Sequence, residues 1–401
     1  MLGNPYPLKQ NAGKSFQGSI VLGKGFVLTP EEAEVLITKD PRNKDVLFPY
    51  LNGEDLNNDP EQKPSRWVIN FFDWTEEKAR TYPDCFELVE RWVKPERQRW
   101  KLDENGNEIV GTYALRKPLP QKWWIYGEKR PALYETISKV DQVMVVPLVS
   151  KYTSFDLVPT KIVYMHKLAV ILFENFSEFG VLSSTLHNIW CWKNSSTLGA
   201  GTLNYSTTDC FETFPFPITL NNKELETVSR KYNSLRKKIM CDNRLGMTKL
   251  YNQFHNDRLL EISNLAHFPS NGKEFEKIYG KENFSFLKHL CKYSNNTSIK
   301  DACRDILELR ELYCKIDISV LNAYGWSDIS LKHDFYEVDY LPENDRVRFT
   351  IHPNARKEIL RRLLLLNHEQ YSKEQESLPS KQNRRIKIKN DQSFIDLFSD
   401  V

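Results

Sequence analysis

The spacing of hydrophobic and polar positions changes near residue 217. Before that point the apolar runs are short and strand-like, and two segments with helical spacing interrupt them: strands are expected at 66–72, 142–149, 153–158 and 161–173, and helices at 75–91 and 176–192. Beyond it, apolar residues recur every three or four positions in 225–239, 301–318 and 354–369, with an extended hairpin expected at 333–351. The pattern predicts an α+β fold, a mixed sheet-and-helix domain followed by a mainly helical C-terminal domain.

Composition shifts suggest four parts of the chain. A connector is expected at 1–45, with a short helix after Thr29, where an N-cap residue precedes a proline and two acids. The sheet-and-helix domain should span 46–217 and the helical domain 218–371. Residues 372–401 contain basic positions without intervening acids between 381 and 389 and are expected to form a disordered basic tail.

The overall composition excludes some classes of protein. The 401 residues are 40% hydrophobic and 27% charged, which is typical of a folded globular chain and not of a disordered one. No apolar run approaches the ~20 residues of a membrane span, so a cytoplasmic protein without a membrane partner is expected. The net charge of +3 neither requires nor excludes a polyanionic partner, and the distribution of basic residues has to decide.

Motifs for catalysis and cofactors are incomplete. The seven cysteines show no Cys-x-x-Cys spacing, and the eight histidines are dispersed, so reduced packing residues and no metal site are expected. Gly18–Lys24 begins like a phosphate-binding loop, but Gly25 replaces the Ser or Thr that binds magnesium, which favours a structural turn. Asn4–Pro7 has the wrong order for an adenine methyltransferase motif, and Pro83-Asp84 lacks a nuclease partner sequence. We expect no catalytic, cofactor or metal site in this chain.

Basic and aromatic residues alternate between Arg91 and Lys122. Lysines and arginines neutralise phosphates, and amphipathic aromatics support a nucleic-acid surface. Candidates for contacts with a DNA backbone in this stretch are Arg97, Arg99 and Lys122. The alternative is a solvated charged face over an aromatic core.

Several longer strings resemble the target-recognition and C-terminal region of MmeI-like, type IIL restriction-modification enzymes. They are 12–19 (AGKSFQGS), 48–57 (FPYLNGEDLN), 65–74 (SRWVINFFDW), 82–86 (YPDCF), 209–217 (DCFETFPFP) and 321–328 (LNAYGWSD). In that family one polypeptide also carries a nuclease and an adenine-N6 methyltransferase. The resemblance therefore implies sequence-specific recognition of double-stranded DNA, with S-adenosylmethionine and Mg²⁺ needed only by a catalytic methyltransferase and nuclease partner polypeptide.

Other functions remain open from the residues alone. The chain could itself retain S-adenosylmethionine-dependent adenine methylation, although the missing cofactor loop argues against it. A non-functional remnant and a structural or inhibitory subunit are two further alternatives.

The resemblance points to the strand before the Phe-Pro-Phe-Pro sequence as the place where bases are read. Side chains two apart share a strand face, so Thr202 and Asn204 should point together and away from Leu203 and Tyr205. Asn can bond adenine N6 and N7, and Thr can contact a thymine methyl. The alternative is a solvent-facing hairpin edge. Expected contacts to the DNA backbone come from the preceding loop and from one lysine after a buried strand: Trp192, Lys193, Ser195, Ser196 and Lys151.

Overall fold

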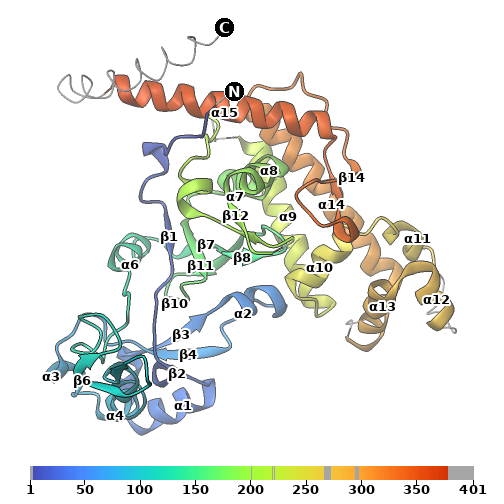
Figure 1. The fold of residues 1–401 in the computed structure, drawn as a ribbon. Helices are drawn as coiled ribbons and strands as arrows, with labels where there is room; N and C mark the ends of the chain where they lie inside the picture. Colours follow the sequence, from blue (N-terminus) through green and yellow to red (C-terminus); the bar gives the residue numbers. More distant parts are fainter. Residues whose placement is uncertain are drawn as a thin grey trace.

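The computed structural model describes residues 3–199, 201–218, 220, 222–265, 272–293 and 298–377 (Figure 1). It has the α+β architecture predicted from the sequence, with several small sheets in the first half and mainly helices in the second. None of the described helices combines the length and the apolar character that a membrane crossing requires.

A four-stranded antiparallel sheet lies at the centre. Its order is β1-β11-β7-β9, formed by Ser15–Gln17, Leu168–Leu172, Gln142–Pro147 and Asp156–Pro159. The continuous apolar run of β7 is buried on both faces, as expected for a central strand. Met144 and Val146 belong to one hydrophobic core, whereas Val143 and Val145 belong to another. The sheet therefore separates two packed layers.

A second sheet builds the lower lobe of Figure 1. Its order is β10-β3-β4-β2, formed by Val163–Tyr164, Leu47–Leu51, Arg66–Ile69 and Val27–Leu28. The same lobe also contains short helices and a small hairpin: α1 (Pro30–Lys39), α3 (Glu76–Ala79), α4 (Pro83–Trp92), α5 (Lys94–Arg97), β5 (Trp100–Leu102) and β6 (Glu108–Tyr113). Thr29 caps α1 in a capping box with Glu32, which confirms the predicted helix start. Two short helices, α2 (Gly53–Asn58) and α6 (Pro131–Ile137), connect this lobe to the central sheet.

The helical part packs around α9 (Lys223–Asp242), which contacts α7 and α14. The remaining helices are α7 (Phe176–Ser183), α8 (Thr185–Asn194), α10 (Met247–Phe254), α11 (Leu259–Ser263), α12 (Gly272–Tyr279), α13 (Lys281–Tyr293), α14 (Ile299–Ala323) and α15 (Pro353–Glu376). The predicted hairpin is present as β14 (Asp334–Glu337) paired with β15 (Val347–Thr350). The expected single helix at 176–192 is divided, because Ser184 ends α7 and caps α8.

The packing does not separate the chain at the predicted domain boundaries. β1 and β2 lie within residues 1–45, yet they pair with β11 and β4. One hydrophobic core extends from Met144 of the central sheet to Leu363 of α15, across the boundary at 217. α15 continues to Glu376, so the first residues of the predicted tail are helical, and residues 378–401 lie outside the described part of the chain.

The glycine-rich string 18–24 is a packed turn, as the broken motif predicted. A Cβ atom on Gly18 would lie 2.2 Å from the carbonyl oxygen of Met165, so only glycine fits there. A short 3-10 helix, Lys24–Phe26, follows in place of the helix that a phosphate-binding loop needs.

Candidate nucleic-acid interface

The strand that carries Thr202 and Asn204 is the middle strand of a small sheet. This sheet has the order β12-β13-β8, formed by Ser196–Thr197, Leu203–Asn204 and Val149–Ser150. Leu203 and Tyr205 are buried, while Thr202 and Asn204 are partly exposed. Thr202 and Asn204 are therefore on the more exposed face of the strand, as predicted. That these two side chains read bases stays a prediction.

The loop before this strand is held by its own polar side chains. Asn204 is opposite Ser196 in the pairing of β12 and β13, and its Nδ2 donates to Ser196 Oγ at 3.0 Å. Ser195 Oγ accepts a hydrogen bond from the Ser206 backbone N–H at 3.2 Å. Lys193 is exposed at the end of α8. Of these candidates, Lys193 and Ser196 have the exposed side chains that a phosphate contact needs, whereas Ser195 stabilises the hairpin.

Lys151 and Trp192 face the C-terminal region. Lys151 Nζ forms an ion pair with Asp345 at 2.9 Å. The Trp192 indole stacks on the Tyr340 ring with centroids 4.5 Å apart. Lys151 therefore joins the end of β8 to the loop of the β14–β15 hairpin, and Trp192 joins α8 to the same loop. Lys151 already has an acidic partner.

The prediction for Arg97 is wrong. Its side chain is fully buried, and the guanidinium donates to the carbonyl oxygens of Val21, Leu22 and Ile125 at 2.5–3.1 Å. Burial without an acidic partner lowers the pKa of Arg97 to about 10. A phosphate could reach this group only if the lobe opened, so Arg97 is a structural residue.

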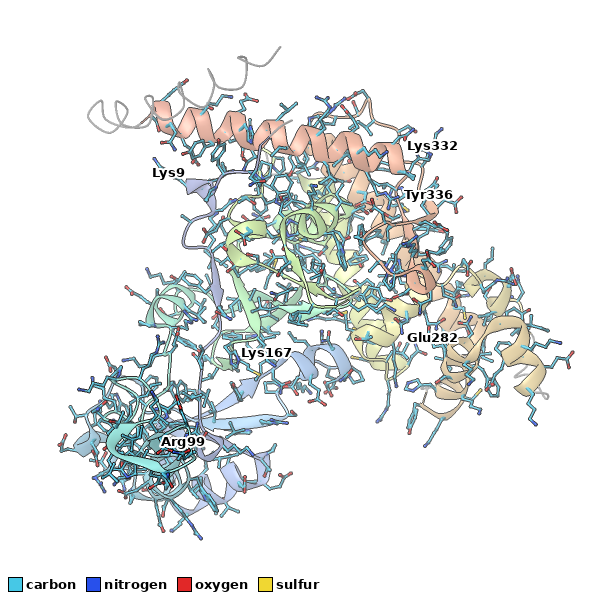
Figure 2. All side chains as sticks on the ribbon, in the orientation of Figure 1. Lys9, Arg99, Lys167, Glu282, Lys332 and Tyr336 are labelled. Atoms are coloured by element: carbon cyan, nitrogen blue, oxygen red, sulfur yellow. The ribbon has the colours of Figure 1, made fainter. Side chains whose placement is uncertain are left out.

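Arg99 and Lys122 are exposed but belong to the lower lobe. Figure 2 labels Arg99 there, and Figure 1 shows β6 of the same lobe well separated from β12. The tryptophans that directly follow this basic and aromatic segment, Trp123 and Trp124, are in the lobe core. The exposed cations Arg99 and Lys122 lie away from the strand with Asn204 (Figure 1).

A groove beside the small sheet collects basic residues that the sequence analysis did not select. It offers about 580 Å³ of space and is lined by the exposed cations Lys24, Arg66 and Lys167, with Val149 of β8 at its edge. Val149 is the pairing partner of Asn204, so the groove adjoins the strand proposed to read bases. Within the described ranges, none of the three cations has a carboxylate within 4.0 Å. Figure 2 labels Lys167 between the lobe and the upper part of the molecule.

The sequence could not predict this set of cations, because its members lie far apart in the chain. Lys24 begins the short 3-10 helix, Arg66 is in β4, and Lys167 is in the loop before β11. The only local signal was Lys24 at the end of the glycine-rich string.

The expectation of dispersed cysteines and histidines also needs correction. His187 and Cys191 stand one turn apart on α8, and Cys210 joins them, with the nearest ligand atoms of the three within 4.8 Å of one another. All three side chains are fully buried. The two sulfurs are 2.9 Å apart, closer than the ~3.8 Å that follows from Zn–S bonds of about 2.3 Å in a tetrahedral site. The expectation that this chain holds no metal site stays a prediction.

Matches to a protein family and to a solved structure together cover most of the chain. The family model described as "MmeI, target recognition domain" matches residues 10–218. Among solved structures, the type IIL restriction-modification enzyme MmeI, determined in complex with DNA, is similar with a TM-score of 0.51 at 16% sequence identity. The match covers 92% of this chain and 36% of that one, so the chain spans about a third of the length of MmeI and shares its fold over that part. No curated protein matches. Because the family model covers more than half of the residues, including both sheets and the strand with Asn204, the chain belongs to the MmeI target-recognition-domain family.

Proposed function

We propose that this chain recognises a specific sequence in double-stranded DNA as the specificity part of a type IIL restriction-modification system. The observation that carries the proposal is the family match over residues 10–218, which includes the small sheet and the basic groove beside it. Thr202 and Asn204 would read base edges, and the groove cations would hold phosphates.

The electrostatics of the groove support this assignment. Lys24, Arg66 and Lys167 project from three separate elements, and Glu54 is the only acidic residue among those that line it. Phosphate contacts position a protein on the duplex, and side chains on an adjacent strand then reach the bases. Lys193, exposed in the last turn of α8 just before β12, is a further cation for phosphate contacts.

We assign adenine methylation and DNA cleavage, with their S-adenosylmethionine and Mg²⁺, to a methyltransferase and nuclease partner. Such a system acts on DNA in the cytoplasm. A direct test is incubation of the purified chain with labelled S-adenosylmethionine and duplex DNA. No incorporation is expected from the chain alone, and robust incorporation would overturn this assignment.

The recognition proposal predicts different roles for two neighbouring residues. Asn204→Ala should relax or change the preferred base at one position, at a cost of about 1–3 kcal/mol, because it removes a bidentate contact to a base edge. The measurement is selection from randomised duplexes with the parent and the variant. Identical base preferences would show that the reading strand is placed wrongly.

Lys193→Ala is the matched control for that experiment. It should weaken binding equally for cognate and non-cognate duplexes and reduce the salt slope by about 1, because a phosphate contact carries no base information. Fluorescence anisotropy at several salt concentrations measures both quantities. A parent chain whose affinity is unchanged between low and physiological salt would contradict DNA binding itself.

A further inference from the structure

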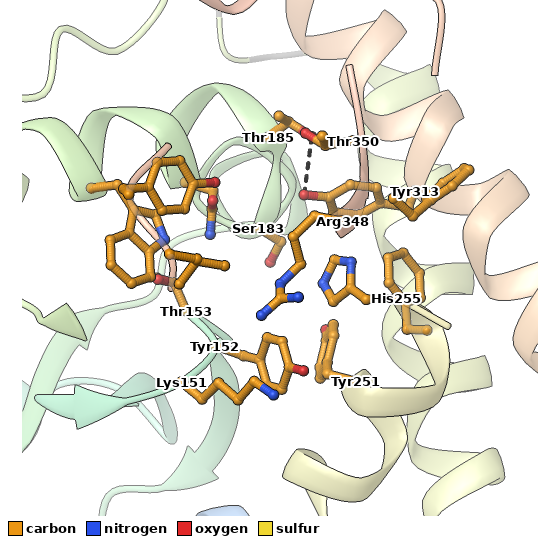
Figure 3. A pocket seen from close by; sticks show the side chains of 16 residues that line it. Lys151, Tyr152, Thr153, Ser183, Thr185, Tyr251, His255, Tyr313, Arg348 and Thr350 are labelled. Carbon is orange, nitrogen blue, oxygen red and sulfur yellow. Dashed lines mark hydrogen bonds between the residues drawn. The ribbon is translucent and has the colours of Figure 1, made fainter. Parts of the chain in front are cut away.

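A small polar cavity lies where the recognition region meets the C-terminal helices (Figure 3). Its walls come from the loop after β8, from helices α7, α8, α10 and α14, and from the β14–β15 hairpin. The centres of water molecules can occupy about 50 Å³ of it, enough for roughly three to five waters. A group with four oxygen atoms has a comparable demand for space.

Polar atoms without hydrogen-bond partners converge on this cavity. Three such atoms belong to residues that line it: Thr153 Oγ1, Ser183 Oγ and His255 Nδ1. Buried polar atoms are almost always paired, so these three atoms would hold whatever ligand or water fills this space. Each of these atoms is able to donate a hydrogen bond, so a ligand rich in acceptor oxygens would pair with all three.

The charges at the cavity also favour an anion. Arg348 is 93% buried, and Figure 3 shows its guanidinium in the middle of the lining side chains. No acidic residue is among the sixteen that line the cavity. Arg348 and Lys151 both contact Asp345 at 2.9 Å, so two cations share one carboxylate and a charge of +1 remains.

His255 does not add to this charge. Burial, together with the nearby Arg348, Arg310 and Lys151, lowers its pKa well below the ordinary value. The neutral imidazole stacks on the Tyr152 ring with centroids 5.4 Å apart, and its Nδ1 is able to carry the donated proton.

We propose that this cavity binds one phosphate group, held by Arg348 and Lys151 with the hydroxyls of Ser183 and Thr153 as further donors. Asp345 is the internal competitor, because its carboxylate holds the same two cations in the ligand-free chain. Arginine and lysine are the usual partners of phosphate oxygens in proteins.

Two sources supply this chemistry, a phosphodiester of bound DNA and free inorganic phosphate. Lys151 follows β8, the strand that pairs with Asn204, and its side chain is 31% exposed, which places the opening of the site beside the proposed reading strand. The DNA source rests on the proposed function, whereas binding of inorganic phosphate does not.

The first experiment is titration of the full chain with inorganic phosphate at constant ionic strength, followed by calorimetry and thermal melting. The parent should show saturable binding. Asp345→Asn should bind about tenfold more tightly, because it removes a like charge beside the ligand. A gain of affinity cannot result from unfolding. Arg348→Gln and the milder Ser183→Ala should weaken binding, while Lys139→Gln, an exposed lysine outside the cavity, should match the parent.

The second experiment distinguishes the sources. Cognate duplexes carry a neutral methylphosphonate at one backbone position at a time, and their affinities are measured for the parent and for Ser183→Ala. If DNA supplies the phosphate, one position should weaken binding by the parent and have a smaller effect on the variant. If phosphate binds but no such position exists, the ligand is free phosphate.

Absence of phosphate binding by both the parent and Asp345→Asn, together with no sensitive backbone position, would show that water alone fills the cavity and would overturn the proposal. That result leaves sequence recognition intact, since the randomised-duplex selection with Asn204→Ala tests recognition separately.

Discussion

Arg97 and Arg99 are two positions apart and have opposite surroundings. Arg97 is enclosed and bonded to carbonyl oxygens, while Arg99 is exposed. Sequence composition treats both as surface cations. The difference arises because α5 ends at Arg97 and directs that side chain beneath the turn at Val21–Leu22.

This contrast predicts unequal stability effects at the residue scale. Arg97→Met should lower the free energy of unfolding by about 3 kcal/mol or more, because it leaves several buried carbonyl groups unpaired. Arg99→Met should change it by less than about 0.5 kcal/mol. Urea denaturation of the two variants measures both. Equal effects would contradict the structural role of Arg97.

At the scale of elements, α7 and α9 approach each other at Gly180. A Cβ atom there would lie 2.2 Å from Ser229 Oγ and 2.8 Å from Leu225 Cδ1. The helical pattern of both segments is visible in the sequence, but the closeness of their contact is not. Packing also occupies cations of α9: Arg236 is fully buried and pairs with Asp156 at 2.5 Å, and Lys238 pairs with Asp305.

Gly180→Ala tests this helix contact. Alanine favours an isolated helix by about 1 kcal/mol over glycine, yet overpacking in a tight core costs about 1–3 kcal/mol. We expect net destabilisation in urea denaturation. Gly3→Ala is the control, since its added methyl meets no atom within 4 Å. A stabilised Gly180→Ala variant would show that the two helices separate at little cost.

At the scale of the whole molecule, Asp317 connects the recognition region to the C-terminal region. Its carboxylate is fully buried on α14 and accepts hydrogen bonds from the Thr185 backbone N–H at 2.7 Å and from His333 Nε2 at 2.8 Å. Burial alone would lower the pKa of His333, but hydrogen bonding to Asp317 raises it to about 10. The N-terminal residues add a second connection, because Asn367 of α15 bonds the Tyr6 backbone.

The raised pKa of His333 predicts a pH-dependent contribution to stability. The folded state holds the proton more tightly than the unfolded state, so the contribution is complete below about pH 6.5 and is lost as the pH rises through about 10. His333→Gln should cost roughly 3 kcal/mol at pH 6 and much less at pH 10.5. Urea denaturation at several pH values measures the difference. A cost that is independent of pH would contradict a charged His333.

The sequence by itself determined the α+β class, the change to helices near residue 217, the cap at Thr29 and the alternation of Thr202 and Asn204 with buried neighbours. These features depend on local spacing and capping, which adjacent residues specify. Only the tertiary structure decided which cations are available: it buried Arg97 and Arg236, paired Lys151 with Asp345, and gathered Lys24, Arg66 and Lys167 into one groove. It also brought Cys210 to His187 and Cys191. Burial and charge pairing depend on contacts between residues far apart in the chain, and neither composition nor periodicity contains that information.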